Sequence, residues 1–125
     1  MLARALILLL LLVALTACGV PRAAQPFAAA QAIADISSMT DDDIRAALRR
    51  QDAAWSTFAT LIHQREPFGL PAVDQCFLQT IDTVRATARR QCDLMDAHTD
   101  DPAKNRQLLT SFNRLWQKSA TYLAQ

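Results

Sequence analysis

Hydrophobic positions recur at helical spacing in three long segments of the chain, 41–65, 73–98 and 102–125. In each segment, apolar side chains return every three or four residues, which places them on one face of a helix. The positions that share these faces are Ile44, Leu48, Gln51, Trp55, Phe58 and Ile62; Val73, Phe77, Ile81, Val84, Ala88, Cys92 and Met95; and Leu108, Leu109, Phe112, Leu115, Trp116 and Leu123. The pattern predicts three long helices.

Residues that begin or stop helices stand at the ends of these segments. Thr40 precedes three aspartates and is predicted to cap the first helix. Segment 66–71 contains two prolines and a glycine, through which a helix cannot continue. Either Asp100 or Asp101 is predicted to cap the third helix, with Pro102 as its first residue. Because the connections are short, neighbouring helices should be antiparallel.

An alanine-rich segment, 28–36, precedes the first long helix and favours a short helix by propensity. No segment shows the alternation of a half-buried strand. The predicted fold is therefore all-α, a small antiparallel helical bundle of three long helices plus a short N-terminal helix. We expect this domain to occupy residues 27–125.

The first residues of the chain follow a different pattern. Arg4 is followed by 11 consecutive apolar residues, 5–15, and then by three small residues. This is the layout of a signal peptide. A membrane-spanning helix is the weaker interpretation, because it needs about 20 apolar residues and Pro21 ends the run earlier.

The tetrapeptide Leu15-Thr16-Ala17-Cys18 resembles a bacterial lipobox. The resemblance implies that residues 1–17 are removed and that the Cys18 thiol carries diacylglycerol. Two or more acyl chains hold a protein stably on a membrane. Gly19, rather than an aspartate, implies sorting to the outer membrane, with the domain on the periplasmic side. Residues 18–26 would be the lipidated tether; the alternative is an ordinary signal peptide cleaved elsewhere.

The charge of the mature chain excludes two classes of partner. The sequence has 13 basic and 12 acidic residues, and Arg4 leaves with the signal peptide, so the remaining charges balance. A chain without excess basic charge is not expected to bind nucleic acid or anionic lipid head groups.

Cys76 and Cys92 would remain as thiols in a compartment where disulfides persist. They are 16 residues apart, so on one continuous helix they lie about 24 Å apart, whereas a disulfide needs Cα atoms within about 7 Å. The helix is favoured. A break near Thr80 would permit the bridge, and an exposed Cys76 could instead form a mixed disulfide or a dimer.

Two groups of residues are candidate metal sites. The first lies at the end of segment 73–98 and has no calcium-loop spacing; it consists of Asp93, Asp96, His98, Asp100 and Asp101. The second, His63 with Glu66, is at best half of a di-metal motif, and the chain has no other glutamate. Both are interpreted as solvated helix ends. No nucleophile motif occurs, so we expect a non-enzymatic protein without cofactor or small-molecule substrate.

Two basic ridges and four aromatic residues are candidate contact surfaces. The ridges are expected to be solvated faces balanced by acids, although they could dock an acidic peptide. The aromatic residues are expected in the core, although they could form the floor of a groove for a partner's amphipathic helix. The ridges are Arg45, Arg49 and Arg50 with Arg85, Arg89 and Arg90, and the aromatic residues are Trp55, Phe58, Phe112 and Trp116.

Together these features predict an outer-membrane-anchored lipoprotein that binds another envelope protein and assists its localisation or assembly. In layout, a lipid-anchored helical domain with two periplasmic cysteines, the chain is similar to secretin pilotins. The alternatives are an inhibitor or exclusion lipoprotein that blocks an incoming protein, and a metal-binding sensor.

Overall fold

The computed structural model describes residues 23–65, 69 and 71–124. In this part of the chain the regular structure is entirely helical, which confirms the predicted all-helical fold. The elements are α2 (Ala24–Gln31), the 3-10 turn η2 (Ile36–Ser38), α3 (Asp41–Arg49), α4 (Gln51–Arg65), α5 (Ala72–Asp96) and α6 (Pro102–Leu123). The predicted signal peptide, the lipobox with Cys18 and most of the tether lie outside the described residues.

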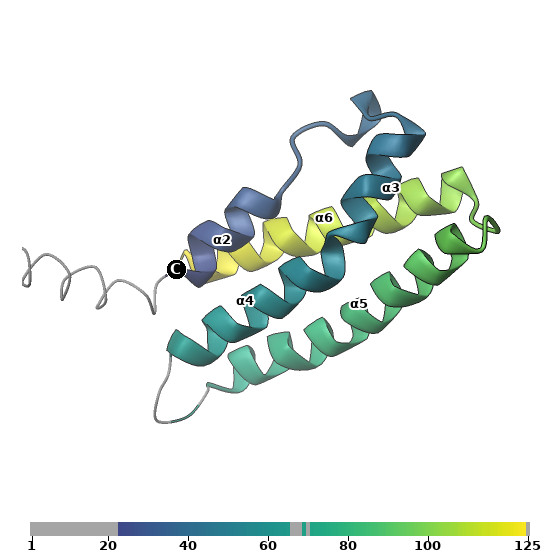
Figure 1. Cartoon of the computed structure of the whole chain (residues 1–125). Helices are drawn as coiled ribbons and strands as arrows, with labels where there is room; N and C mark the ends of the chain where they lie inside the picture. Colours follow the sequence, from purple (N-terminus) through teal and green to yellow (C-terminus); the bar gives the residue numbers. More distant parts are fainter. Residues whose placement is uncertain (1–22, 66–68, 70, 125) are drawn as a thin grey trace, which may run out of the picture.

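The helices form a bundle in which α4 and α5 run in opposite directions, and α6 returns past them (Figure 1). α5 packs against α3 and α4, whereas α6 packs against α2 and α3. The short helix α2 also contacts α4, and its first residues lie close to the C-terminal end of α6 (Figure 1). The start of α2 and the end of α6 therefore lie at the same end of the bundle (Figure 1).

The predicted caps of the long helices are present. The Thr40 hydroxyl accepts a hydrogen bond from the Asp43 backbone at 3.1 Å, and the Asp43 carboxylate accepts one from the Thr40 backbone at 3.1 Å. Asp101 caps α6 by accepting from the Ala103 backbone at 3.0 Å, with Pro102 as the first helical residue. Local sequence signals therefore set both helix starts.

The single helix predicted for 41–65 is wrong in one respect, because it is divided at Arg50 into α3 and α4. The Arg50 backbone N–H donates to the Ala47 carbonyl at 3.2 Å, three residues back rather than four. The Gln51 side-chain amide donates to the same carbonyl at 3.3 Å. A side chain thus bonds the carbonyl at the end of α3, and the hydrophobic stripe continues across the turn.

The N-terminal helix lies earlier than segment 28–36, and its first residue, Ala24, is only 1% exposed. The expected domain start at 27 and the tether to 26 are corrected accordingly, since residues 24–26 belong to a packed helix. After α2 the chain is extended because Asn113 of α6 bonds both backbone groups of Ile33, at 2.7 and 3.0 Å. Buried backbone groups need such partners, and Asn113 supplies them outside a helix.

The core consists of two neighbouring clusters that use the predicted faces. In the first, the rings of Trp55 and Trp116 stack with centroids 3.4 Å apart, and Phe58 meets Trp116 edge-on at 5.4 Å. The second cluster joins α3, α5 and α6 and contains Ile44, Ala47, Leu48, Ala88, Met95, Leu109 and Phe112. The interpretation of the hydrophobic stripes as buried helix faces is confirmed.

α5 ends at Asp96, slightly before the predicted end near His98, in a Schellman turn. The His98 N–H donates to the Met95 carbonyl at 3.1 Å and the Thr99 N–H to the Leu94 carbonyl at 3.0 Å. This turn places His98 at φ 55°, a left-handed conformation that glycine adopts most easily. His98 is therefore conformationally strained.

His98→Gly is expected to raise the free energy of unfolding by about 1 kcal/mol, because a non-glycine residue pays roughly that cost in the left-handed region. Urea unfolding followed by circular dichroism would measure it. The matched control is Ala97→Gly, one residue earlier at φ −81°, which should not stabilise the protein. Equal effects of the two substitutions would contradict the strain at His98.

Candidate functional site

The four aromatic residues proposed as a groove floor are buried. Trp55, Phe58, Phe112 and Trp116 are each 3% exposed or less. The ring of Phe27 in α2 contacts that of Trp116 edge-on, with centroids 6.0 Å apart. α2 therefore covers the apolar face that was considered as the floor of an open groove. The interpretation of these rings as core residues is correct, and the four do not form an open floor together, although Phe112 also lines a surface hollow beside α6.

Gln51 joins the two tryptophans through hydrogen bonds. Its Oε1 atom accepts from the indole Nε1 of Trp55 and from that of Trp116, both at 3.1 Å. Its amide nitrogen donates to Ala47, as described above. Because Gln51 is only 6% exposed and both of its polar atoms are bonded, its role is structural rather than ligand-binding.

Half of the ridge arginines form ion pairs between helices. Arg45 pairs with Asp100 at 2.9 Å, Arg49 with Asp96 at 2.8 Å and Arg85 with Asp52 at 2.8 Å. Two of these contacts join α3 and α4 to α5, and the pair of Arg45 with Asp100 joins α3 to the connection that follows α5, as expected for balanced faces. Three of the arginines considered for docking an acidic peptide are thus occupied. The other three, Arg50, Arg89 and Arg90, form no ion pair within the described part of the chain.

The acidic group at the end of α5 does not assemble as a cation site. Asp100, whose side chain is 7% exposed, accepts from Arg45 and, at 2.7 Å, from the Asn105 side chain, while Asp101 caps α6. Among the described residues no three His, Cys, Asp or Glu side chains are placed to hold a metal. His63 is exposed at the end of α4, and Glu66 lies outside the described residues.

The hydrogen bonds from Arg45 and Asn105 lower the pKa of Asp100 below its usual 3.8. A carboxylate with a lowered pKa stabilises the fold above its unfolded pKa and loses that contribution as the pH falls through its folded value. Asp100→Asn should therefore destabilise the protein by a constant amount from pH 7 to about pH 5. The difference from wild type should shrink below pH 3.8. Urea unfolding at several pH values would test this, and a difference that grows towards acid would contradict it.

Cys76 and Cys92 are both free, and α5 is unbroken across them. The Thr80 hydroxyl donates to the Cys76 carbonyl at 3.1 Å within the helix, rather than capping a new one. The disulfide that a break would have allowed is therefore not formed within the chain. Cys76 is exposed, whereas burial raises the pKa of the half-buried Cys92 thiol.

Alkylation should distinguish the two thiols, because the thiolate is the reactive form. At pH 8, iodoacetamide is expected to modify Cys76 at least about tenfold faster than Cys92, since Cys92 is less accessible and its burial raises its own pKa. Peptide mass spectrometry of timed samples would measure both rates in one protein. Equal rates would show that Cys92 is not protected by its packing.

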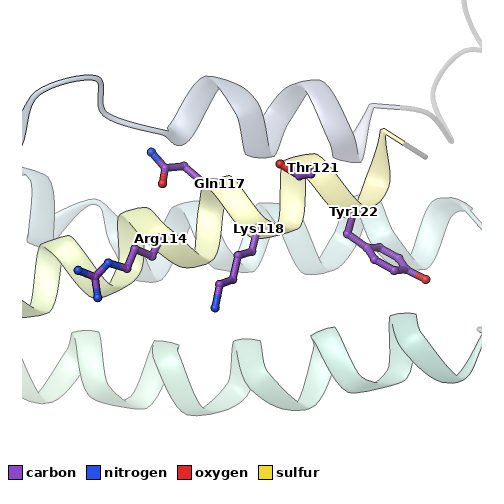
Figure 2. Close-up of a pocket in the computed structure, with 5 residues that line it drawn as sticks. All are labelled: Arg114, Gln117, Lys118, Thr121 and Tyr122. Atoms are coloured by element: carbon purple, nitrogen blue, oxygen red, sulfur yellow. The ribbon is translucent and has the colours of Figure 1, made fainter.

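A groove lies between α5 and α6, and we call it the α5–α6 groove. It consists of hollows that share residues along its length. The central one, with a volume of about 400 Å³, and one neighbour are lined by both helices, whereas the hollow near the C-terminal end of α6 is lined by α6 residues. Figure 2 shows Lys118 and Tyr122 extending from α6 at one end of it. The apolar residues that form its floor are Val84, Leu108, Phe112 and Leu115. The residues along its rim are Thr87, Arg90, Gln91, Lys104, Gln107, Ser111, Arg114, Gln117, Lys118, Thr121 and Tyr122.

The charge of the groove is one-sided. Residues 102–125 contain four basic residues and no acidic residue. Three of these cations, Lys104, Arg114 and Lys118, line the groove together with Arg90 of α5. None of the four forms an ion pair within the described ranges. The arrangement can attract an anionic group while offering it an apolar floor.

The basic ridges of 41–65 and 73–98 did not predict this surface, because three of its four cations lie on 102–125. The available signal was the absence of acids along 102–125.

Comparison with protein-family models, with curated proteins and with solved structures finds no match. None of the helices in the described part of the chain combines the length and apolarity that a membrane span requires.

Proposed function

We propose that this protein is a lipoprotein anchored through Cys18 in the outer membrane, and that its periplasmic helical domain binds another envelope protein at the α5–α6 groove. The scaffold in this proposal is an antiparallel bundle of three long helical segments with α2 as a short N-terminal helix. The anchor rests on the signal-peptide pattern and the lipobox. The binding role rests on one observation, the apolar groove bordered by cations that lack ion-pair partners in the described chain.

An elongated protein segment fits this groove better than a small molecule does. Small-molecule sites are concave and enclose most of the ligand surface, whereas the hollows here follow one another along α6. From Lys104 to Tyr122 the groove extends about 27 Å at 1.5 Å per helical residue. Contact along that length is typical of a protein segment lying on a surface.

The test is photo-crosslinking in cells, with a benzophenone amino acid placed at one position of the full-length protein. From Leu108 in the groove we expect a crosslink to a resident envelope protein, and from Thr57, exposed on α4, we expect none. A secreted or foreign protein captured from Leu108 would support the inhibitor alternative instead. Failure of Leu108 to capture any protein would contradict the binding role.

The anchor has a separate test. Mass spectrometry of protein purified from membranes should show an N-terminal peptide beginning at Cys18 with diacylglycerol on its sulfur. Cys18→Ser should move the protein out of the membrane fraction. An unmodified chain that begins elsewhere would overturn the proposed anchoring, whatever the crosslinking shows.

A further inference from the structure

We propose that the occupant of the α5–α6 groove is an acidic amphipathic helix of about five turns, carried by the partner protein. This inference rests on the proposed function, because it specifies the chemistry of the partner. It depends on the spacing, exposure and charge of the residues that α5 and α6 present to the groove.

The α6 side of the groove has the spacing of a helix-packing seam. Its residues follow one another at alternating steps of four and three, and every one of them lines a hollow; they are Lys104, Leu108, Ser111, Leu115, Lys118 and Tyr122. This 3.5-residue repeat keeps one face of a helix against a neighbouring helix. In the described structure, that face of α6 borders an open hollow along its length.

The α5 side continues the same pattern. Val84, Thr87 and Gln91 line the hollows at steps of three and four, and Leu94 is the next position of that register. Within the described chain, Leu94 at 39% and Tyr122 at 42% are the only large hydrophobic residues that are exposed. Each therefore continues one of the two seams, so a helix lying in the groove would cover apolar surface that the domain leaves in water.

The charge of the seam selects an acidic helix. Lys104 and Lys118 occupy seam positions, and Arg90 and Arg114 stand beside them. A docked helix brings its flanking side chains against these cations, where acidic groups are attracted and basic groups are repelled. The paired arginines on α3 and α5 could not discriminate in this way, because their charges are already balanced.

Two other occupants fit less well. The apolar floor is recessed, with Phe112 only 3% exposed, so a flat membrane surface would reach the cations without reaching the floor. A second copy of the chain would have to supply an acidic helix face. Its longest helix, α5, carries four aspartates but also three arginines, and one of each is engaged in the ion pairs above.

The experiment measures binding of two synthetic 18-residue helices to the full lipidated protein in nanodiscs of neutral lipid. Both peptides carry leucines at steps of three and four; one has glutamates beside them and the other has lysines at the same positions. Fluorescence anisotropy gives both dissociation constants. We expect the glutamate peptide to bind at least about tenfold more tightly, and its affinity to fall as salt is raised.

Charge reversal locates the site. The double substitution Lys104→Glu with Lys118→Glu should lower the affinity for the glutamate peptide at least about tenfold and should raise the affinity for the lysine peptide. The matched control, Arg50→Glu with Arg89→Glu, changes the net charge equally at exposed positions outside the groove and should alter binding by no more than about twofold. Circular dichroism melting would confirm that both double variants are folded.

Several outcomes would overturn the inference. The first is equal affinity for the two peptides, and the second is no binding of the glutamate peptide at about 1 mM. The third is a loss of glutamate-peptide affinity in the control variant as large as that in the groove variant. Binding to vesicles of anionic lipid that needs Lys104 and Lys118, without peptide binding, would assign the groove to a membrane surface. A dimer in sedimentation that these reversals abolish would assign it to a second copy. A partner crosslinked from Leu108 through a segment that is not an acidic helix would leave the proposed function standing while this inference fails.

Discussion

Trp116→Ala is expected to lower the free energy of unfolding by about 3–5 kcal/mol, the usual cost of removing a buried tryptophan. Trp116 is 1% exposed, stacks on Trp55 and is met edge-on by Phe27 and Phe58. Its ring thus joins α2, α4 and α6, and no neighbour can fill its volume. Because a small domain has a stability of only about 5–15 kcal/mol, this loss is a large fraction of the total.

Urea unfolding followed by circular dichroism at 222 nm measures this loss without relying on tryptophan fluorescence. Trp116→Phe should lose less, because most of the ring contact remains. The matched control is Gln117→Ala, the next residue on α6 and exposed, which should change the stability by less than about 0.5 kcal/mol. A loss at Trp116 no larger than at Gln117 would contradict the central place of the aromatic cluster.

The helices, their buried faces and their caps could be predicted because each depends on residues close in sequence. The stripe of 41–65 repeats within a few turns, and Thr40 needs only Asp43 to cap it. By contrast, α2 ends at Gln31 where Asn113, about 80 residues later, bonds Ile33. No local pattern in 28–36 reports that contact, so the predicted helix was displaced.

The break at Arg50 was hidden for the same reason. Gln51 lies on the apolar stripe at the correct helical spacing, and neither glycine nor proline marks the turn. Its side-chain oxygen accepts a hydrogen bond from Trp116, 65 residues away. Sequence spacing therefore gives the direction of the side chain, while its bonding partners are set by how α4 and α6 pack.

The candidate site could be predicted only in part. The charge of residues 102–125 is evident from the sequence, but its meaning depends on which cations find partners. Arg45, Arg49 and Arg85 looked equally available until α5 packed beside α3 and α4 and brought acids to them. Lys104 and Lys118 face a groove instead, because α6 packs against α2 and α3. The bundle thus divides its cations between helix attachment and a surface groove.

The groove assumed for the aromatic residues illustrates the opposite error. Wide apolar faces predicted an opening, and the three long segments alone would leave one. The chain closes it with α2, which adds Ala24, Phe27 and Ala28 to the cluster that contains the tryptophans. Because alanine side chains are small, the helix can approach closely, and a segment with little amphipathic character still seals the core.

Gln51→Met is expected to lower the free energy of unfolding by about 2–4 kcal/mol, although methionine has nearly the same shape. The substitution removes the oxygen that accepts from both Trp55 and Trp116. Each buried donor left without a partner costs about 1–3 kcal/mol. Urea unfolding measures the loss, and Gln107→Met, exposed on α6, serves as the matched control.

A double-mutant cycle tests whether the orphaned indole groups are the cause. In a Trp116→Phe background one of the two donors is absent, so Gln51→Met should cost about 1–2 kcal/mol less there than in the wild type. The same cost in both backgrounds would mean that the loss comes from the bond to Ala47 or from packing at the turn. A smaller cost would show that the loss of the acceptor for the indole N–H groups accounts for the destabilisation.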